Sequence, residues 1–372
     1  MERYDVVVVG VGGMGSSALY HLARRGKRVV GIERFDLLHE HGSSHGLTRI
    51  IRLAYFEHPD YVPLLRRAYE LWHELESESG GELMRITGIV EGGGRVLDGV
   101  LRSCAEHDLA HEVLSGAEVA RRFPAYRLPA EQEFAYQPDG GFVVPERCIL
   151  AHVQGALAHG AVLRARERVL DWTETQGGVL LRTDRGEIAA ERIVLTAGSW
   201  SQDVARLAPG LVGATRQSLA WLQPTRPEIF TPDRMPVFNF EVDDEHYYGF
   251  PSHGIPGFKL GLFDRLAEHG DPDAIDRVPT LADEAPLRAF AERYFPEGAG
   301  PTVALKTCLF EPSPDEHFLI DVHPDAPRAV VGAGFSGHGF KFCSVVGEIL
   351  ADLAVDGATR HDIGLFRLDR FS

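Results

Sequence analysis

The N-terminal segment limits most strongly what this chain can fold into. Residues 5–9, Asp-Val-Val-Val-Val, are typical of a buried parallel strand, and a G-x-G-x-x-G turn follows directly. After the turn comes a helical pattern that stops at Gly26, and then a second apolar strand over residues 29–32 that ends at the acid Glu33. Strand, glycine turn, helix, strand and acid in this order predict a unit that binds an ADP-containing dinucleotide, either FAD or NAD.

Each glycine of the turn has a separate physical role. Gly10 permits the tight turn, Gly12 lets the backbone approach a pyrophosphate, and Gly15 lets the helix pack closely on the strand. The free N–H groups at the helix N-terminus suit a phosphate. Glu33 is placed to accept hydrogen bonds from ribose hydroxyls, and its charge disfavours a 2′-phosphate. A glycine cluster that serves helix packing alone is the alternative, but it leaves the second strand and the acid unexplained.

The composition narrows the range of functions further. The chain has 372 residues, enough for about two domains, and a net charge of −16. That acidity argues against nucleic acid and anionic membranes as partners, so an anionic substrate needs a local cluster of basic groups. The four cysteines show neither a CxxC pair nor metal-like spacing, as expected in a reducing cytosol. We also find no apolar run of transmembrane length and no room for a signal peptide, and we expect a cytoplasmic protein.

The order of elements predicts an α/β fold with two domains. Helical patterns cover residues 61–79 and 281–295, and short strands alternate with turns over 213–263. Apolar strands run into glycine turns at residues 193–198 and again at 329–334. We therefore expect one nucleotide-binding domain built from distant segments, with a strand-rich substrate domain inserted between them. The predicted bounds are 1–84, 140–212 and 314–372 for the first domain, and 85–139 and 213–313 for the second, which is built on a mixed β-sheet.

Two arginines follow the dinucleotide signature. If Thr48 caps a helix, Arg49 and Arg52 lie one turn apart on one face, where two guanidinium groups suit a carboxylate. The alternative is a solvated helix face with ordinary surface arginines. Three histidines in the same segment match no zinc spacing, so we predict no metal site. They are His39, His41 and His45.

Four further side chains have both an ordinary and a functional interpretation. Lys259 interrupts an apolar strand, either as a snorkelling edge residue or as a charge that faces a cavity. Lys341 follows a glycine-rich turn after a buried strand, where ligands bind in nucleotide folds. By default Cys308 is an inert buried thiol and Tyr248 is a strand packing residue. The residues by themselves leave both interpretations open.

Taken together, four segments resemble the monomeric sarcosine oxidase and N-methyltryptophan oxidase group of flavin amine oxidases. They are GSSHGLTRIIR at 42–52, YYGFP at 247–251, PDEHF at 314–318 and GFSGHGFKF at 334–342. The likeness covers nearly the whole chain. It implies an α/β protein with a discontinuous Rossmann-like FAD-binding domain and a substrate domain on a mixed sheet, within the bounds given above.

The resemblance implies that the dinucleotide is FAD. Gly10, Gly12, Gly15 and Glu33 then hold its ADP half. Cys308 matches the cysteine that this family joins by a thioether to the 8α-methyl carbon of the flavin, so we expect covalent FAD. The full set of expected cofactor-binding residues is Gly10, Gly12, Met14, Gly15, Glu33, Arg34, Ser43, Ser44, Thr48, Arg49, Ala197, Gly198, Trp200, Cys308, Gly337, Gly339, Phe340 and Lys341.

The resemblance also implies roles at the reacting centre. Arg52 and Lys341 match the pair that clamps the substrate carboxylate, and Lys259 matches the lysine near flavin N5, where oxygen is activated. These matches favour a functional interpretation of all three cations. The remaining expected catalytic residues match groups that line the flavin ring or lie beside the substrate. They are His45, Arg49 and Tyr248.

Four positions depart from the pattern of the sarcosine oxidases. Phe263 stands where those enzymes have a pocket histidine, and Phe310 stands where they have a tyrosine. Leu47 replaces an acidic residue and Ser44 replaces a histidine. We expect Phe263 and Phe310 to line the substrate pocket and to make it more apolar. The sequence therefore predicts a preference for N-alkyl or cyclic amino acids with an apolar substituent, and poor activity on sarcosine.

The predicted function is the FAD-dependent oxidation of secondary amines by O2. The products are an imine, which hydrolyses to an aldehyde and an amine, and hydrogen peroxide. The expected partners are a small-molecule amino-acid substrate and O2, and the protein is expected to be a monomer. A nicotinamide dehydrogenase would leave Cys308 and the C-terminal glycine turn unexplained. A flavin amine dehydrogenase that passes electrons to a quinone or a protein would share nearly all of these features. A flavin-binding subunit without turnover would have no need of Arg52, Lys259 and Lys341.

Overall fold

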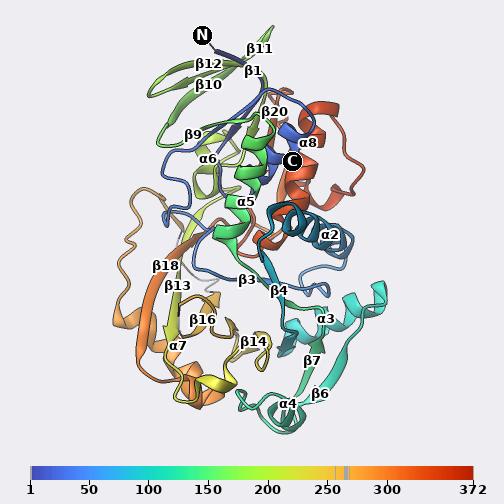
Figure 1. Cartoon of the computed structure of the whole chain (residues 1–372), viewed down its shortest axis with the longest axis vertical. Helices are drawn as coiled ribbons and strands as arrows, with labels where there is room; N and C mark the ends of the chain where they lie inside the picture. Colours follow the sequence, from blue (N-terminus) through green and yellow to red (C-terminus); the bar gives the residue numbers. More distant parts are fainter. Residues whose placement is uncertain (1, 256, 264–266, 268, 372) are drawn as a thin grey trace.

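Two large β-sheets form the two halves of the molecule, one above the other in Figure 1. The computed structural model describes residues 2–255, 257–263, 267 and 269–371. Strands of the upper sheet come from residues 2–32, 162–195 and 319–333, which are distant in sequence. This arrangement is the discontinuous α/β architecture that the sequence predicts. The domain bounds themselves stay a prediction.

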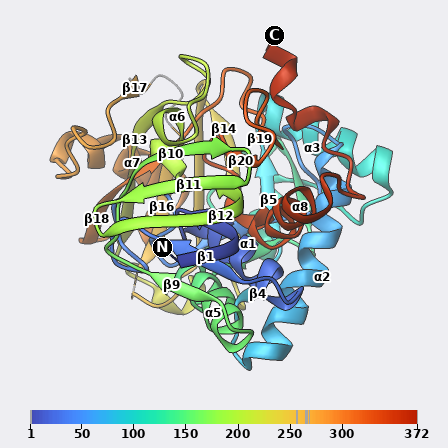
Figure 2. The same cartoon turned by 90° about the horizontal axis from the view of Figure 1, so that it is seen from above.

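The upper sheet is parallel from β9 through β1 to β20, and antiparallel pairs add β10, β11 and β19 to it. The strand β1 pairs in parallel with β2 and β12, and β20 pairs in parallel with β12. In the view from above, β10, β11, β12 and β1 lie side by side in this order (Figure 2). In spatial order the strands are β10 (Val169–Thr175), β11 (Gly178–Thr183), β12 (Gly186–Leu195), β1 (Glu2–Val9), β2 (Val29–Ile32) and β9 (Val162–Arg164), with β20 (Ala329–Ala333) beside β12 and β19 (Leu319–Val322) beside β20.

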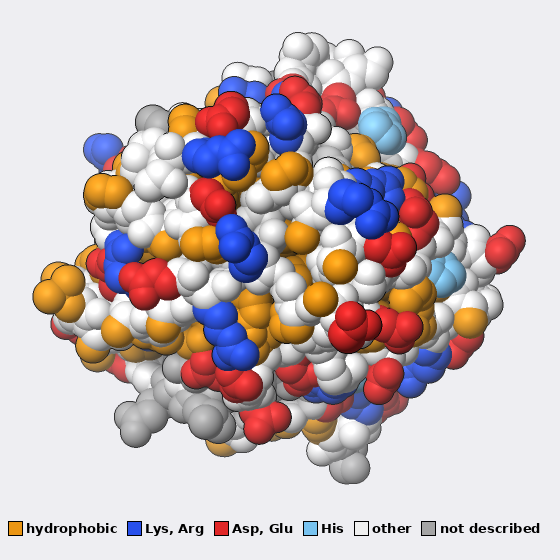
Figure 3. Space-filling view, turned by 90° about the horizontal axis from the view of Figure 1, so that it is seen from below, with side chains coloured by type: hydrophobic (Ala, Val, Ile, Leu, Met, Phe, Trp, Pro, Cys, Tyr) orange, Lys and Arg blue, Asp and Glu red, His pale blue; other side chains and the backbone are white. Residues whose placement is uncertain are grey.

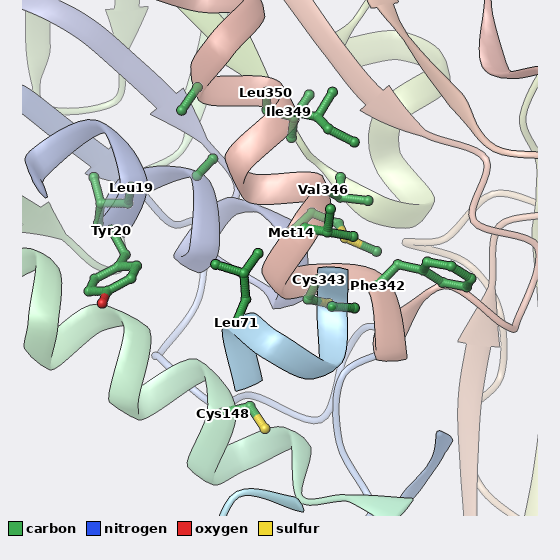
Figure 4. Close-up of a cluster of buried hydrophobic side chains, with 14 of the residues drawn as sticks. Met14, Leu19, Tyr20, Leu71, Cys148, Phe342, Cys343, Val346, Ile349 and Leu350 are labelled. Atoms are coloured by element: carbon green, nitrogen blue, oxygen red, sulfur yellow. The ribbon is translucent and has the colours of Figure 1, made fainter. Parts of the chain in front are cut away.

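The valine run of β1 is explained by burial on both faces of this sheet. Val6 and Val8 pack into one hydrophobic core, and Val7 and Val9 pack into another on the opposite face. Burying one such side chain stabilises the fold by about 1.5–3 kcal/mol. The first core lies among the helices α1 (Gly13–Arg24), α2 (Tyr61–Ser79), α5 (Pro145–Ala158) and α8 (Cys343–Asp356), and Figure 4 shows side chains from all four of them.

Two glycines explain the tight entry into α1. Gly10 has a φ of +86°, a conformation that other residues rarely adopt. A Cβ atom on Gly15 would lie 1.8 Å from the carbonyl oxygen of Gly10, so the strand and the helix approach as closely as predicted. The helix α2 ends at Gly80 with a left-handed cap, which confirms the predicted helix over 61–79.

The lower sheet is mixed, because β14 pairs in parallel with β5 while its other pairs are antiparallel. In spatial order its strands are β17 (His269–Gly270), β13 (Ala214–Leu222), β16 (Phe258–Phe263), β15 (Glu245–Phe250), β14 (Val237–Val242), β5 (Ile89–Gly92), β7 (Glu133–Gln137) and β6 (Glu112–Ser115), with β18 (Thr302–Phe310) beside β13. The other helices are α3 (Gly94–His107), α4 (Gly116–Arg122), α6 (Ser201–Val204) and α7 (Leu281–Tyr294). Short 3-10 turns occur at Gly198–Trp200, Pro227–Ile229, Pro296–Gly298, Phe340–Phe342, Gly364–Phe366 and Leu368–Phe371.

A small third sheet joins the two halves, and it corrects one prediction. Thr48 does not cap a helix, because the next residues form the strand β3 (Arg49–Ile51). This strand pairs with β8 (Gly141–Val143), which also pairs with β4 (Met84–Ile86). The β-branched side chains of Ile50 and Ile51 are buried, and they favour a strand over a helix.

The surface carries charges of both signs. On the face seen from below, Lys and Arg side chains are interspersed with Asp and Glu side chains (Figure 3). None of the helices in the described part of the chain is long and apolar enough to cross a membrane.

Candidate active site

A cavity of about 450 Å³ opens where the parallel strands β1, β2 and β12 end. Ligands of open α/β sheets bind at this edge, outside the carboxyl ends of the strands. The structure brings fourteen of the predicted cofactor-binding residues into the wall of this larger cavity. They are Gly10, Gly12, Met14, Glu33, Arg34, Ser43, Ser44, Arg49, Ala197, Gly198, Trp200, Gly337, Gly339 and Phe340.

The backbone at Gly12 faces open space in this cavity. A Cβ atom placed there would meet Ser44 Oγ at 3.8 Å and no other described atom within 4 Å. The N–H of Gly13 donates to Ser44 Oγ at 3.3 Å. The N-terminus of α1 therefore presents main-chain N–H groups and a hydroxyl to the cavity, which suits a pyrophosphate.

Glu33 is held in place by the backbone around it. Its two carboxylate oxygens accept hydrogen bonds from the N–H groups of Val11 and Phe35, both at 2.9 Å. Burial alone would raise the pKa of Glu33, but hydrogen bonds from His39 and from these N–H groups outweigh burial and lower the pKa. An ionised acceptor is thus fixed at the end of β2, where a ribose would lie.

The inner wall of the larger cavity contains an acid that the sequence did not predict. Glu311 is buried, and its Oε2 has no hydrogen-bond partner among the described residues. Burial raises the pKa of Glu311 to about 8, although N–H groups of Phe335 and Gly334 oppose this shift. The glycine-lined N-terminus, the fixed acceptor at Glu33 and this orphaned carboxyl oxygen together fit a dinucleotide such as FAD.

A smaller cavity of about 70 Å³ adjoins the larger one. Arg49, Phe310, Gly337 and Phe340 line both cavities. A ligand in the smaller cavity would therefore lie next to one end of a bound dinucleotide. The predicted substrate-binding residues and the predicted catalytic tyrosine line this smaller cavity, namely Arg52, Lys341, Phe263, Phe310 and Tyr248.

Arg52 is buried and paired, so it is not an ordinary surface arginine. Its exposed fraction is 3%. Arg52 Nη2 donates to Glu57 Oε2 at 2.8 Å, and Nε lies 3.2 Å from Glu91 Oε1. Burial disfavours the charged guanidinium, but Glu57 and Glu91 outweigh burial and raise the pKa of Arg52. A permanent positive charge with unused donors therefore lies in the cavity wall.

Lys341 supplies a second cation to this wall. Its Nζ donates to the carbonyl oxygen of His338 at 2.7 Å and lies 3.4 Å from the hydroxyl of Tyr55. Burial and the charge of Arg52 lower the pKa of Lys341 to about 7. An anion bound beside it would favour the ammonium form, so Lys341 is suited to a carboxylate.

Lys259 lies behind the wall of the smaller cavity. Its exposed fraction is 2%, which excludes a snorkelling edge residue. The Nζ donates to Gly46 O at 2.7 Å, to Thr48 O at 2.9 Å and to Thr48 Oγ1 at 3.0 Å. Burial and the charge of Arg49 lower the pKa of Lys259 well below its usual range, while three oxygens accommodate the three N–H bonds of the ammonium. Phe250, which lines the cavity, separates Lys259 from it, with 4.6 Å between Nζ and the ring centroid.

Four other predicted site residues also line neither cavity. Gly15 serves the packing of α1 on β1, and Thr48 holds Lys259. His45 is buried with both ring nitrogens unpartnered among the described residues, and burial lowers its pKa to about 3. Cys308 is buried on β18, two residues before Phe310 and therefore on the same strand face. Arg49, by contrast, lines both cavities and donates to the carbonyl oxygens of Thr48 and Ser43.

The two phenylalanines form an aromatic part of the wall of the smaller cavity, and Phe310 also lines the larger one. The ring centroids of Phe263 and Phe310 are 5.2 Å apart. A Cβ atom on Gly337 would lie 2.4 Å from Phe310 and 2.8 Å from Phe263, so the glycine turn fits closely against both rings. Both rings present apolar surface to the smaller cavity.

Sequence reasoning missed the acids that hold Arg52, as well as four other polar residues in the wall of the smaller cavity. Glu91 interrupts an apolar strand, and this signal could have indicated a functional acid. Glu57 gave no comparable signal, because its partner Arg52 was expected on a helix rather than beyond a strand. The other polar residues of this wall that were not predicted are Asn239, His246, Glu316 and His338. In the part of the chain that is described, no group of three or more His, Cys, Asp or Glu side chains could hold a metal ion.

Comparisons with known proteins agree with this geometry. The sequence profile of the family described as FAD dependent oxidoreductase matches residues 5–353. Monomeric sarcosine oxidase from Streptomyces avermitilis is 40% identical, over 98% of this chain and 96% of that protein. N-methyl-L-tryptophan oxidase from Yersinia pestis is 32% identical over 99% of both chains. The structure of NikD, an unusual amino acid oxidase essential for nikkomycin biosynthesis, has a TM-score of 0.87 and 28% identity over 99% of this chain and 98% of that chain. The chain belongs to the FAD-dependent oxidoreductases.

Proposed function

We propose that this protein is an oxidase of secondary amines, acting on N-alkyl or cyclic amino acids with FAD as cofactor and O2 as electron acceptor. The products are an imine, which water hydrolyses to an aldehyde and an amine, and hydrogen peroxide. The observation that carries the proposal is the pair of buried cations, Arg52 and Lys341, in a cavity that shares four wall residues with the dinucleotide cavity. The printed names of the relatives, sarcosine oxidase and N-methyltryptophan oxidase, support the same substrate class.

The FAD would be held by the glycine turn, by Glu33 and by the walls of the larger cavity. When bound, FAD supplies the two-electron oxidation of the carbon next to the amine nitrogen and passes the electrons to O2. The protein contributes position and charge. Arg52 and Lys341 would bind the substrate carboxylate and thereby fix which carbon faces the larger cavity.

The remaining groups would act through charge and through the exclusion of water. Lys259 interacts electrostatically with Arg49, which lines both cavities, and the three oxygens that accept from Lys259 Nζ favour its ammonium form against the effect of burial. A preorganised positive charge of this kind stabilises developing negative charge by a few kcal/mol. We propose that it does so during the reduction of O2. The rings of Phe263 and Phe310 would keep water away from the reacting carbon.

We also propose that FAD is attached to Cys308. The thiol lies on the strand face of Phe310, whose ring lines both cavities. Burial raises the pKa of Cys308, against the charges of Arg49 and Lys259, so without cofactor the thiol is protonated and unreactive. A monomeric state and a cytoplasmic location complete the proposal, the first supported by the name of the sarcosine oxidases and the second by the pattern of cysteine usage.

A screen of amino acids with hydrogen peroxide as readout tests this function. We expect turnover of N-methyl amino acids with large apolar side chains, of proline and of pipecolate, and a lower kcat/KM on sarcosine. The aromatic wall explains this order, because Phe263 and Phe310 offer apolar contact rather than hydrogen bonds. Rapid reoxidation of the reduced protein by air distinguishes the oxidase from a dehydrogenase, for which reoxidation would be slow. A higher kcat/KM on sarcosine than on the large N-methyl amino acids would contradict the substrate preference.

A further inference from the structure

The wall of the smaller cavity contains an imidazole that the proposed function does not use. His246 lines this cavity and stacks on Phe263 with 5.6 Å between the ring centroids. It also contacts the ring of Phe56 edge-on at 5.5 Å. His246 on β15 is the direct cross-strand partner of Phe263 on β16. One polar ring is therefore set among the phenyl rings of the wall.

A chain of hydrogen bonds fixes the tautomer of this imidazole. The backbone N–H of Ala54 donates to Gln137 Oε1 at 2.8 Å, so Gln137 Nε2 donates to Glu91. Glu91 Oε1 accepts from Asn239 Nδ2 at 3.0 Å, which leaves Asn239 Oδ1 to contact His246 Nε2. Because an amide oxygen can only accept, His246 Nε2 carries the hydrogen.

His246 Nδ1 is consequently a hydrogen-bond acceptor. Burial lowers the pKa of His246 to about 4, although Glu57 opposes this shift, so the ring is neutral near pH 7. His246 Nδ1 is buried and has no hydrogen-bond partner among the described residues. Among buried side-chain acceptors that line this cavity in the described chain, it alone lacks a partner. Such an atom favours a ligand that brings a donor.

We propose that His246 determines specificity by accepting a hydrogen bond from the nitrogen of the bound amino acid. The inference rests on the proposed function, because it takes Arg52 and Lys341 as the carboxylate site. Arg52 Nε lies 3.2 Å from Glu91, and Glu91 is connected through Asn239 to His246, so the cation and the acceptor belong to one network. Every amino acid with a secondary amine carries an N–H one carbon away from its carboxylate.

Each end of the substrate would then have its own partner. The cations bind the carboxylate, and the neutral imidazole selects ligands with an N–H donor. Asn239 is a positioning residue in this account, because it acts through His246 by keeping the hydrogen on Nε2. A ligand of the same shape that lacks the N–H should bind more weakly, because His246 Nδ1 then stays buried without a hydrogen-bond partner.

Two unreactive carboxylates of nearly equal shape test this inference. Pyrrole-2-carboxylate has an N–H where furan-2-carboxylate has an oxygen. Calorimetric titration of the FAD-containing protein should show roughly tenfold tighter binding of pyrrole-2-carboxylate. His246→Phe should reduce this preference to within about twofold, while the affinity for furan-2-carboxylate stays within about threefold. Asn239→Leu should reduce the preference for pyrrole-2-carboxylate only in part. Without Asn239 Oδ1 the hydrogen of His246 is no longer fixed on Nε2, so Nδ1 is an acceptor in only a fraction of the molecules.

The matched control is His253→Phe. The ring of His253 packs against Phe142 at 4.9 Å and lines neither cavity, so this variant should retain the full preference. Equal binding of the two ligands by wild type, or an unchanged preference in His246→Phe, would overturn the inference and leave the proposed function standing. If neither ligand binds to wild type, the carboxylate site itself is wrong, and the proposed function fails together with the inference.

Discussion

The larger cavity is built mainly from backbone, whereas the smaller cavity is built from buried charged side chains. In the larger cavity Gly12 leaves space for a ligand, and backbone N–H groups hold Glu33. In the smaller cavity Arg52 depends on Glu57 and on Glu91, which lies on a separate element. The difference teaches that the first site depends on the path of the main chain, and the second depends on each buried charge keeping its partner.

Substitution of Arg52 should cause the largest loss of activity and of stability among the variants considered. Arg52→Met leaves Glu57 and Glu91 buried without their cation and removes one partner of the substrate carboxylate. Loss of one member of a buried ion pair lowers the free energy of unfolding by about 3–5 kcal/mol, so Tm should decrease. Loss of one charged partner of the substrate carboxylate weakens binding by about 2–5 kcal/mol, so kcat/KM should fall by roughly a thousandfold. Steady-state kinetics and thermal unfolding measure both. Arg127→Met, which removes an exposed arginine paired with Glu297, should change neither appreciably.

Two glycine variants separate the fold from the dinucleotide site. Gly15→Ala should destabilise the protein, because its methyl group would lie 1.8 Å from the carbonyl oxygen of Gly10. Gly12→Ala has room for its methyl group, so the apoprotein should keep its stability to within about 1 kcal/mol. The same methyl would displace a pyrophosphate, and FAD affinity should fall by roughly ten- to a hundredfold. Equal FAD affinity in Gly12→Ala and wild type would contradict the placement of the pyrophosphate.

The architecture near the chain ends was predictable from sequence, because its signals are local. The glycine turn, the valine strand and the end of α2 at Gly80 each follow from short-range chemistry. Of the residues that these local signals indicated for the dinucleotide, Gly10, Gly12 and Glu33 line the larger cavity, whereas the other cofactor residues were expected only from the family resemblance. Local geometry at Gly10 and Gly15 requires glycine whatever the rest of the chain does.

The smaller cavity was predictable only through its resemblance to known enzymes. Arg52 lies just beyond a strand rather than on the expected helix, because the β-branched residues Ile50 and Ile51 favour a strand and pair with β8 across a long sequence separation. The partners Glu91, Asn239 and His246 come from three different strands. No spacing in the sequence brings these strands together, so the charge network emerges only from the fold.

The binding of carboxylate ligands should depend on pH through Lys341. Burial and Arg52 lower the pKa of Lys341 from 10.5 to about 7, so the ammonium is lost as pH rises through this value. Burial raises the pKa of Glu91 to about 7, and its ionisation adds negative charge over the same interval. The affinity for furan-2-carboxylate should therefore fall by roughly tenfold between about pH 6 and about pH 8. Lys341→Met should remove most of this dependence in calorimetric titrations, and an unchanged profile would contradict the assignment.

Substitution of Cys308 should cause the smallest decrease in stability. Cys308→Ala removes one buried sulfur and should lower stability by about 1–2 kcal/mol. If the thioether is present, acid precipitation of wild type leaves the yellow chromophore in the pellet, and the variant releases it into the supernatant. Release from wild type would contradict the covalent link alone, without affecting the oxidase proposal.

The most direct test of the central claim, that the two adjoining cavities hold FAD and an amino acid with a secondary amine, is an anaerobic titration of the FAD-containing protein. N-methyl amino acids with apolar side chains should bleach the visible absorbance of the flavin, and air should restore it with release of hydrogen peroxide. Arg52→Met should require far more substrate for the same bleaching. A flavin that stays oxidised with every N-alkyl and cyclic amino acid tested would contradict the account.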